Sequence, residues 1–506
     1  MRTPSGTAVL AGGVAMAFAL LVVLLLSETG VPFPPVALGQ AIVEALPGAV
    51  SVPLIELLQH WAERLLVIGV LALYLVAGCA AALAALEASV ASLAVVGLGA
   101  LPWVATVASA QILAGEKVDF GGDLFASAVG AAAYYAALAF LLGADRVATP
   151  ASAGRRRFLM GAVAVAAVAA LGSTALGATL RAGKRVASVA LSIRHLRERE
   201  PVAPGDPSFE AIDHLTPRIT SNADHYEVDT ALIKPGVDLA TWKLEIAGGV
   251  EHPYALTWDE LLDLPAVERP HTLECVSNEI GGDLTSTAVW AGVPMADLLA
   301  RATPKADAYD VVLTSVDGYT DSVRIAKALE PDTLVAYLMN GVTIPQDHGY
   351  PARALIPGIY GMKNVKWLTK IEVVSYDYQG YWQQRGWSDV ATYNTHVRID
   401  VPVAAARAAG GHVTVAGIAF AGDRGISRVE VSTDGGTSWH DAALEAPVGR
   451  EAWRRWRYDW AVDNGRFRVV ARATDGQGQT QTSVPRPPFP DGSTGYHAVD
   501  VNVTPG

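Results

Sequence analysis

The chain has little cysteine and little charge. Only two of its 506 residues are cysteines, Cys79 and Cys275. This scarcity excludes a disulfide framework, a zinc site built on CxxC pairs and an iron–sulfur cluster. Charged residues make up 17% and hydrophobic residues 51% of the chain, which excludes a disordered protein and is unusual for a fully soluble one. The net charge of −12 argues against a nucleic-acid partner, because phosphate binding needs clustered lysine and arginine.

Several common catalytic motifs are also missing. The sequence contains no GxSxG, GxGxxG, Walker or HExxH pattern, so serine hydrolase, dinucleotide, nucleotide and zincin chemistry lose their usual support. His271 and Cys275 have the i, i+4 spacing of two ligands on a helix. No second ligand pair accompanies them, so a zinc hydrolase is the weakest of the functional alternatives.

The first third of the chain has the composition of a membrane domain. Residues 1–157 hold 16 of the 88 charged residues, and uncharged runs of 21 to 28 residues follow one another. Each run can cross a hydrocarbon core, which needs about 20 apolar residues. We therefore predict an all-α transmembrane region over residues 1–185 with about five helices. The runs are Thr3–Ser27, Leu65–Leu86, Ala88–Gly115, Leu124–Ala144 and Phe158–Leu180, and the weaker stretch Val36–Leu58 is expected at the interface.

Basic residues in the short loops predict the orientation of this region. Arg146 and three consecutive arginines from Arg155 precede the fifth run, which places that loop in the cytoplasm and the later domains outside. The segment Gly154–Met160, with its Arg155-Arg156 pair, resembles a twin-arginine export signal; a positive-inside anchor is the alternative. We expect a multi-pass protein of a bacterial cell membrane with an extracytoplasmic remainder.

The helical region itself shows no sign of chemistry. Ionisable residues are nearly absent from the runs, and His60 is the only histidine before residue 195. A bis-histidine haem needs two axial histidines, so no haem is expected there. Cys79 is interpreted as a small packing residue. The region is therefore expected to be an anchor or a docking surface.

The soluble remainder is expected to hold two domains after a proline-rich linker at 186–209, in which Ser192–Glu200 is predicted to be helical. Strand and helix patterns mix over residues 210–399 and predict an α+β domain with mixed sheets. Short alternating strands with glycine turns over residues 400–506 predict an immunoglobulin-like β-sandwich. The expected elements are strands at Trp242–Ile246, Val311–Ser315 and Ile371–Ser375, a turn into a helix at Ser286–Arg301, sandwich strands at Val413–Phe420, Ser427–Ser432, Trp456–Ala461, Arg466–Ala473 and Thr480–Ser483, and hairpin turns at Asp434-Gly-Gly and Asp475-Gly.

Two segments carry residues with chemical potential. Cys275 lies in His271–Glu279; it is either a buried packing residue or a thiolate able to bind a soft transition metal. The segment Gln346–Trp367 combines cations with glycines, and such loops either close on a phosphate or remain solvated. Its cations are His348, Arg353, Lys363 and Lys366.

Together these segments resemble the molybdopterin domain of the sulfite oxidase family. The similar motifs are Leu273–Asn278, Trp290–Leu299, Leu338–Arg353 and Ile356–Leu368, in the same order and spacing. The resemblance covers roughly Ile219–Val503, so the sandwich is similar to the family's dimerisation domain. The anchored N-terminus and the run from Ser221 to Glu227 are closer to bacterial exported members than to animal sulfite oxidase.

The resemblance implies a role for each matching position. Cys275 would be the thiolate ligand of molybdenum, one per chain, with Asn278 adjusting the potential of that thiolate through hydrogen bonds. The remaining cofactor contacts would come from Tyr226, Glu227, Ser315, His348, Arg353, Asn364, Val365 and Lys366.

The sequence departs from animal sulfite oxidases where an anionic substrate would bind. Glu279 follows the metal cysteine's motif where those enzymes place an arginine, and Trp387 stands where they carry a tyrosine. A glutamate near the metal repels a dianion, with Arg385 as partial compensation; alternatively Glu279 points to solvent. We place Arg385 and Trp387 with Cys275 and Asn278 in the expected catalytic set.

The sequence thus predicts a membrane-anchored molybdenum-molybdopterin oxidoreductase that performs two-electron oxidation or oxygen-atom transfer on a small S- or N-oxide-type substrate. Because no haem segment is visible, a separate redox partner is expected, either a cytochrome or a membrane electron carrier. A homodimer is a possible assembly through the sandwich. The alternative is a non-catalytic binding or assembly protein that retains the fold.

Overall fold

A computed structural model describes residues 5–27, 33–46, 62–85, 93–114, 120–146, 188–231, 234–408 and 411–505. The chain forms two compact units. One comprises residues 1–186 with 231–233, and the other comprises residues 187–230 with 234–506.

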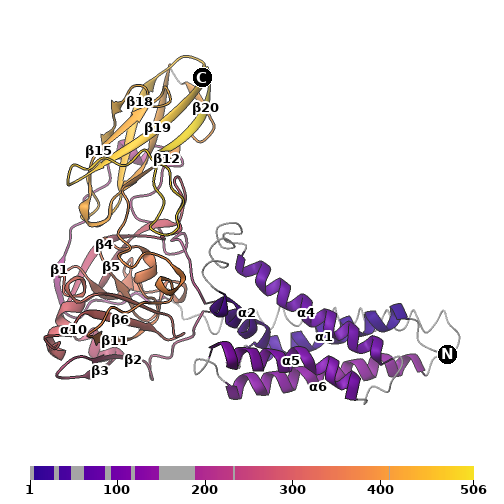
Figure 1. Ribbon diagram of the computed structural model, residues 1–506. Coiled ribbons are helices and arrows are strands. Elements are labelled where there is room, and N and C mark those ends of the chain that lie inside the picture. The colour runs from indigo at the N-terminus through magenta and orange to yellow at the C-terminus, as the bar shows by residue number, and fades with distance from the viewer. Residues whose placement is uncertain are drawn as a thin grey trace. The chain divides into compact units, whose positions relative to one another are not determined.

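The first unit is helical (Figure 1). Three helical segments are long and apolar enough to cross a membrane: Ala8–Ser27, Leu65–Ala84 and Gly121–Leu142. The third predicted run, Ala88–Gly115, is also helical, but its apolar stretch Gly97–Ala108 is shorter than a span. The fifth run and the arginine pair lie outside the described residues. The helices are α1 (Ser5–Ser27), α2 (Pro34–Ala45), α4 (Ala62–Ala84), α5 (Leu93–Ala114) and α6 (Phe120–Arg146).

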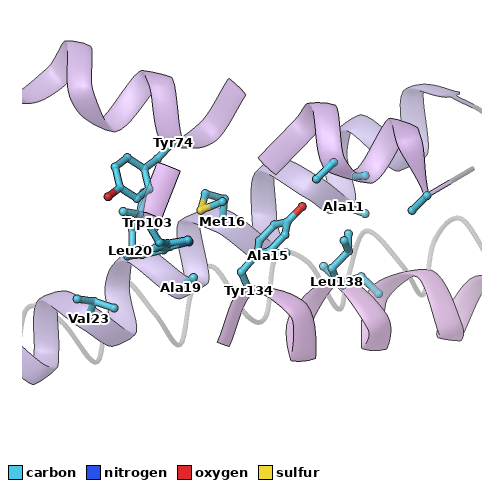
Figure 2. Close-up of a cluster of buried hydrophobic side chains, with 14 of the residues drawn as sticks. Ala11, Ala15, Met16, Ala19, Leu20, Val23, Tyr74, Trp103, Tyr134 and Leu138 are labelled. Atoms are coloured by element: carbon cyan, nitrogen blue, oxygen red, sulfur yellow. The ribbon is translucent and has the colours of Figure 1, made fainter. Parts of the chain in front are cut away.

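Small residues bring these helices into close contact, and large apolar side chains gather between them (Figure 2). A Cβ on Gly12 would lie 2.3 Å from the carbonyl oxygen of Gly78, and one on Gly130 would lie 2.5 Å from the Trp103 ring. Such small residues at helix contacts are typical of membrane bundles, where packing replaces the hydrophobic effect.

The α+β domain of the second unit contains two mixed sheets, as predicted. One has the order β1-β4-β5-β8-β10 with β9 on β8, and the other has the order β3-β2-β11-β6-β7. Strand β1 is parallel to β4 and β2 is parallel to β11, whereas the remaining pairs are antiparallel. The strands are β1 (Leu196–Arg199), β2 (Lys243–Gly248), β3 (Tyr254–Thr257), β4 (Ala266–Glu274), β5 (Thr285–Pro294), β6 (Asp310–Ser315), β7 (Thr320–Arg324), β8 (Leu334–Met339), β9 (Val342–Thr343), β10 (Arg353–Leu355) and β11 (Leu368–Val374).

Short helices connect these strands. The α-helices are α8 (Pro207–Glu210), α9 (Trp258–Leu262), α10 (Met295–Ala302) and α11 (Ile325–Ala328). The 3-10 turns of this domain are η3 (Gln346–His348), η4 (Gly361–Lys363) and η5 (Gln383–Arg385).

Three expectations for this domain are wrong. The predicted helix at Ser192–Glu200 contains strand β1, so part of the expected linker belongs to a sheet. The predicted turn at Ser286 is strand β5, and only its continuation from Met295 is helical. His271 lies within strand β4, so the helical spacing to Cys275 does not exist. In each case pairing with a distant strand overrides the local pattern.

Residues after 395 form the predicted two-sheet sandwich, in which β15, β18, β19 and β20 group together (Figure 1). One sheet has the order β12-β14-β18-β17 and the other β13-β20-β19-β15-β16. Apolar side chains from both sheets fill the core, including Val415, Trp456 and Val469. The elements are β12 (His396–Val401), β13 (Ala405–Ala408), β14 (His412–Phe420), η6 (Gly422–Arg424), β15 (Ile426–Ser432), β16 (His440–Asp441), β17 (Ala443–Leu444), β18 (Arg454–Ala461), β19 (Gly465–Asp475) and β20 (His497–Pro505).

Two details of the sandwich differ from the prediction. Thr480–Ser483 is not a strand; Thr480 makes only an isolated bridge to Thr474. The sheet is completed instead by β20, which the sequence analysis missed. The turn after Asp475 uses Gly478 as its positive-φ residue, at φ 83°, rather than the glycine that follows the aspartate.

Candidate active site

Cys275 follows directly after strand β4 and is buried. Its backbone N–H donates to Leu284 at 2.9 Å, and its Sγ lies 2.9 Å from the hydroxyl oxygen of Ser277. Burial raises the pKa of the thiol above its ordinary value. A buried cysteine therefore stays protonated unless a cation binds it, and metal coordination removes the proton outright.

Asn278 shapes the turn that carries Cys275. Its amide nitrogen donates to Oε1 of Glu274 at 3.2 Å, and its amide oxygen accepts from the Leu284 N–H at 3.0 Å. Both ends of the side chain are thus used within the turn, and neither bond involves the sulfur. Glu279, the residue that follows, is exposed, which agrees with the solvent-facing alternative.

Arg353 is the strongest indication of an anion site. Its guanidinium is 3% exposed and donates to the carbonyl oxygens of His348 at 3.0 Å and Asn364 at 2.9 Å. No carboxylate of the described residues forms an ion pair with it; Asp229, which pairs with Lys366, acts on it only at longer range. Burial lowers the pKa of Arg353 to about 10, which leaves the group charged at neutral pH. A buried, charged arginine that bonds only to carbonyls is suited to bind an anion.

A second group of buried side chains lies beside Arg353. The His225 and His348 rings are 5.0 Å apart, and Trp290 lies edge-on to His225 at 5.8 Å. Nε2 of His348 bonds to the carbonyl of Asn222 at 2.8 Å, whereas its Nδ1 is buried without a partner. Burial lowers the pKa of His348 to about 4, so the ring is neutral; because Nε2 donates to the Asn222 carbonyl, Nδ1 is left as a hydrogen-bond acceptor.

Lys366 and the segment after Tyr226 are linked by ion pairs. Nζ of Lys366 lies 2.6 Å from Oδ1 of Asp229 and donates to the carbonyl of Asp347 at 2.9 Å. Lys234 pairs with both Glu227 and Asp347. Tyr226 is partly buried and stacks on His225. Glu227 is exposed and pairs with Lys234, and its expected contact with the cofactor stays a prediction.

Three further predicted residues lie in this region. Asn364 accepts from the Ile356 N–H at 2.7 Å and donates to two carbonyls, so its side chain fixes the loop. Val365 is buried, and its carbonyl accepts from Ala354. Ser315 is opposite Leu368 in the sheet, and its hydroxyl is buried without a partner.

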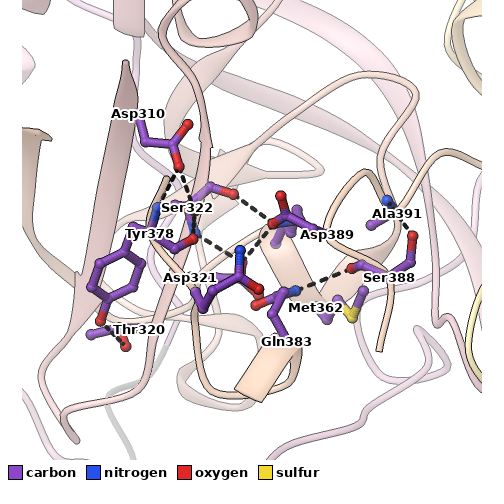
Figure 3. A network of polar contacts seen from close by, with 12 residues as sticks. Asp310, Thr320, Asp321, Ser322, Met362, Tyr378, Gln383, Ser388, Asp389 and Ala391 are labelled. Atoms are coloured by element: carbon purple, nitrogen blue, oxygen red, sulfur yellow. Dashed lines mark hydrogen bonds and ion pairs between the residues drawn. The ribbon is translucent and has the colours of Figure 1, made fainter. Parts of the chain in front are cut away.

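Lys363 does not join the anion site. It is almost fully buried, and its ammonium group bonds to Asp321 at 2.9 Å, to the Ser322 carbonyl at 2.8 Å and to Asp389 at 3.2 Å. Figure 3 shows these acidic side chains among the polar groups that surround them. Lys363 is therefore neither solvated nor available to a phosphate, so it fits neither alternative that the sequence analysis left open for the cations of Gln346–Trp367.

Arg385 and Trp387 lie on the loop that includes η5. Arg385 donates to the Tyr381 carbonyl at 2.8 Å and stacks on the Tyr381 ring at 3.7 Å. Trp387 is 6% exposed and contacts Trp382 and Phe489 edge to face. The indole N–H of Trp387 is buried and has no hydrogen-bond partner.

These residues fit a molybdopterin. A phosphate would satisfy Arg353, and polar pterin atoms would satisfy the buried groups that lack partners. Those groups are Nδ1 of His348, the Ser315 hydroxyl, Nε2 of His225 and Oδ2 of Asp229. By contrast, no group of three histidine, cysteine or acidic side chains able to hold a metal ion occurs in the described residues, so the zinc alternative gains no support.

Sequence reasoning missed Asp229, His225 and Ser277. His225 lies in the run Ser221–Glu227 whose similarity was noted, and Asp229 lies two residues beyond it, so nearness to that run was the only available signal. Ser277 follows Cys275 by two residues, and nothing in the sequence separates it from an ordinary turn serine.

Comparison with known proteins agrees with this site. Residues 231–382 match the oxidoreductase molybdopterin binding domain family, and residues 389–487 match the Mo-co oxidoreductase dimerisation domain family. Mitochondrial sulfite oxidase from Mus musculus is 30% identical over 325 residues, covering 54% of this chain and 59% of that protein. Nitrate reductase [NADH] 1 from Oryza sativa subsp. japonica is 29% identical over 330 residues, covering 52% of this chain and 36% of that protein.

The fold is similar to a solved structure. Sulfane dehydrogenase SoxCD from Paracoccus pantotrophus superposes with a TM-score of 0.51 at 21% identity, covering 65% of this chain and 92% of that one. The chain spans somewhat more than half the length of the mammalian sulfite oxidases that it matches.

A buried cysteine and a buried arginine without a carboxylate partner lie in a domain that matches the molybdopterin-binding family, and a domain that matches the dimerisation family follows; together they indicate a molybdopterin-binding oxidoreductase. The chain belongs to the sulfite oxidase family of these enzymes.

Proposed function

We propose that the chain is a membrane-anchored, extracytoplasmic enzyme with one molybdenum-molybdopterin per chain and no haem. The observation that carries this proposal is the buried Cys275 in the same domain as Arg353, a buried cation without a carboxylate partner. Three apolar helices are compatible with the anchor. The arginine-rich loop before Phe158 supports an outward-facing catalytic domain and, through Arg155-Arg156, export of a folded protein.

The bound cofactor supplies two-electron oxygen-atom chemistry, and the chain supplies its position and access. Arg353 and Lys366 would bind the phosphate of the cofactor, and His348 and Ser315 would form hydrogen bonds with its pterin. The substrate is a small S- or N-oxide: its reduction takes up two electrons and two protons and releases water, and the reverse reaction returns them. These electrons pass to or from a separate redox partner, a cytochrome or a membrane electron carrier. The match to a dimerisation domain supports a homodimer.

The substrate proposal draws on the loop Tyr381–Trp387. This loop contributes aromatic rings, and its single arginine is already bonded to a backbone carbonyl. Because Glu279 is exposed, its charge is screened by solvent and repels a dianionic substrate less strongly than the sequence analysis expected. The charge of Glu279 is therefore a weak argument against an anionic substrate. Relatives named for sulfite and nitrate illustrate that both sulfur and nitrogen oxides occur in the family.

The first test is the metal and pterin content of the full-length protein, purified in detergent from a host that makes the cofactor. We expect about one molybdenum and one pterin per chain. Cys275→Ser removes the thiolate ligand and should abolish redox activity, whereas Cys79→Ser, which changes the other cysteine, should match the wild type. A folded wild-type protein without molybdenum or pterin would favour the non-catalytic binding protein instead.

A further inference from the structure

The loop that carries the metal-ligand candidate connects strands β4 and β5, and we call its residues Cys275–Leu284 the thiolate loop. The two strands pair directly before and after the loop, which fixes its two ends. Within the loop, the Cys275 N–H donates to the Leu284 carbonyl at 2.9 Å, and the amide oxygen of Asn278 accepts from the Leu284 N–H at 3.0 Å. These two bonds close the loop on itself.

Glu274 lies directly before the thiolate loop and is buried. One of its side-chain oxygens, Oε1, accepts from the amide nitrogen of Asn278 at 3.2 Å. The other, Oε2, lies 3.2 Å from Nδ1 of His396 and has no hydrogen-bond partner elsewhere in the described residues. The carboxyl group of Glu274 therefore lies between the thiolate loop and a histidine of the sandwich.

Strand β12 of the sandwich contacts the thiolate loop near both of its ends. His396 and Arg398 are alternate residues of this strand and so belong to one face of it. His396 lies beside Glu274 at the start of the loop, and Nη1 of Arg398 donates to the carbonyl of Gly282 near its end, at 2.9 Å. Nε of Arg398 also lies 2.7 Å from Oδ1 of Asp400, which fixes the direction of the guanidinium.

The contacts around Glu274 are shielded from solvent, because Glu274, Asn278 and His396 are all buried. Gly282 has no room for a side chain, since a Cβ there would lie 2.4 Å from Oδ1 of Asn278. When one partner of a buried polar contact is removed, the group left behind has no water to bond to, and the contact is costly to break. The thiolate loop is therefore held in the position that these contacts set.

We propose that Glu274 and His396 are positioning residues for the molybdenum thiolate. They act on Cys275 through the Asn278 side chain and the backbone of the thiolate loop, not through the sulfur itself. Side chains behind a metal ligand fix the orientation of that ligand and so alter the metal that it binds. This inference rests on the proposed function and adds to it that a strand of the sandwich sets the orientation of the metal ligand.

The first test uses full-length protein from a host that makes the cofactor, with molybdenum content and the electron paramagnetic resonance spectrum of Mo(V) after partial reduction as readouts. Glu274→Leu leaves the Asn278 amide without an acceptor, so the g values should shift and molybdenum content should fall by about 10-fold. Glu274→Gln keeps an acceptor for Asn278 and a polar group beside His396, and both readouts should stay close to the wild type. Glu268→Leu, at a residue of the same strand that pairs with Arg199, is the control.

Two results of this test would overturn the role of Glu274. One is a Glu274→Leu protein with the molybdenum content and spectrum of the wild type. The other is a Glu274→Gln protein altered as much as the leucine variant, because the hydrogen-bond acceptor would then make no difference.

The second test changes the sandwich side and leaves the residue next to Cys275 untouched. His396→Phe keeps a buried ring but removes Nδ1, so the g values should shift in the same direction as in Glu274→Leu. His440→Phe, at an exposed position of strand β16, is the matched control and should give the wild-type spectrum. An unchanged spectrum in His396→Phe overturns the role of β12, and this result decides the matter even where Glu274→Leu does not fold.

The molybdenum content of the wild type separates failure of this inference from failure of the proposed function. A folded wild type without molybdenum contradicts the proposed function, and this inference falls with it. A molybdenum-loaded wild type whose spectrum is shared by all the variants leaves the proposed function intact and overturns the positioning role.

Discussion

At the scale of single residues, the presence or absence of a carboxylate partner distinguishes cations expected to contact the cofactor from cations that stabilise the fold. Lys363 is buried and Lys366 is partly buried, and each has a carboxylate partner, Asp321 and Asp229 respectively. Arg353 has only carbonyl partners. A buried cation without a counter-ion is costly, so a bound anion compensates Arg353 more than either lysine.

Replacing Arg353 should therefore reduce cofactor retention. A charge-assisted hydrogen bond contributes about 1.5–3 kcal/mol, so Arg353→Met should lower the pterin and molybdenum content of purified protein by roughly 10- to 100-fold. Arg301→Met is the control, because that arginine stacks on Tyr254 away from the site. Wild-type cofactor content in Arg353→Met would show that the phosphate binds elsewhere.

The sequence predicted the residues that act locally and missed those that act through distant partners. Cys275, His348 and Arg353 lie in dense motifs, and the structure places them in one domain with buried, unpartnered atoms around them. The pairing of Lys363 with Asp321 joins residues 42 positions apart, which no local pattern encodes. For the same reason, the sequence did not predict that the side chain of Asn364, expected at the cofactor, holds its own loop through hydrogen bonds to the backbone.

At the scale of elements, the Lys363–Asp321 pair fastens η4 to strand β7. The side chains are 2% and 0% exposed, and burial raises the pKa of Asp321 in opposition to the lysine charge. Because η4 precedes Asn364 and Lys366, this pair sets the path of the cofactor loop.

Removing one partner of that pair should be more damaging than removing both. Lys363→Met leaves a buried carboxylate without its counter-ion and should lower the free energy of unfolding by about 3–5 kcal/mol. The double variant Lys363→Met with Asp321→Leu should recover much of this loss. Thermal unfolding of the three proteins measures the difference, and equal losses in both variants would contradict the buried-pair interpretation.

Element types were predictable where the pattern was strong, and boundaries were not. Trp242–Ile246 and Val311–Ser315 are strands as expected, because their apolar residues alternate or run continuously between turns. The sequence predicts a turn at Ser286, but Ser286–Pro294 belongs to a central strand that pairs with β4 and β8. Its glycine, Gly292, packs against the backbone of β8. A Cβ at Gly292 would lie 2.2 Å from the Val335 carbonyl oxygen, a contact visible only in the folded sheet.

At the scale of the whole second unit, the α+β domain and the sandwich share buried polar contacts. The Thr272 N–H donates to the Glu451 carbonyl at 2.9 Å, and the Trp453 N–H donates back to the Thr272 hydroxyl at 2.9 Å. Glu451, on the sandwich side, is 2% exposed, and its backbone forms an isolated β-bridge with His271. Burial lowers the pKa of His271 to about 3, so this histidine is neutral and provides no counter-charge.

This interface should make stability depend on pH. Burial, and then the charge of Asp423, raise the pKa of Glu451 to about 7, so the folded protein binds its proton more tightly than the unfolded chain does. The stabilisation is complete below about pH 4.5 and is lost as pH rises towards 7, a change of roughly 2–3 kcal/mol. Glu451→Gln resembles the protonated form at every pH, so this variant should match the wild type near pH 5 and unfold at a higher temperature near pH 7.5.

Scanning calorimetry of the full-length proteins between pH 5 and 8 measures the difference in Tm. Glu251→Gln, at an exposed position, is the control and should parallel the wild type throughout. Because Glu274 is also buried with a raised pKa, the wild-type curve alone does not isolate Glu451. The difference in Tm between Glu451→Gln and the wild type isolates the effect of Glu451, because both proteins contain Glu274. A gap that stays constant across this range would mean that Glu451 keeps one protonation state at the interface between the two domains.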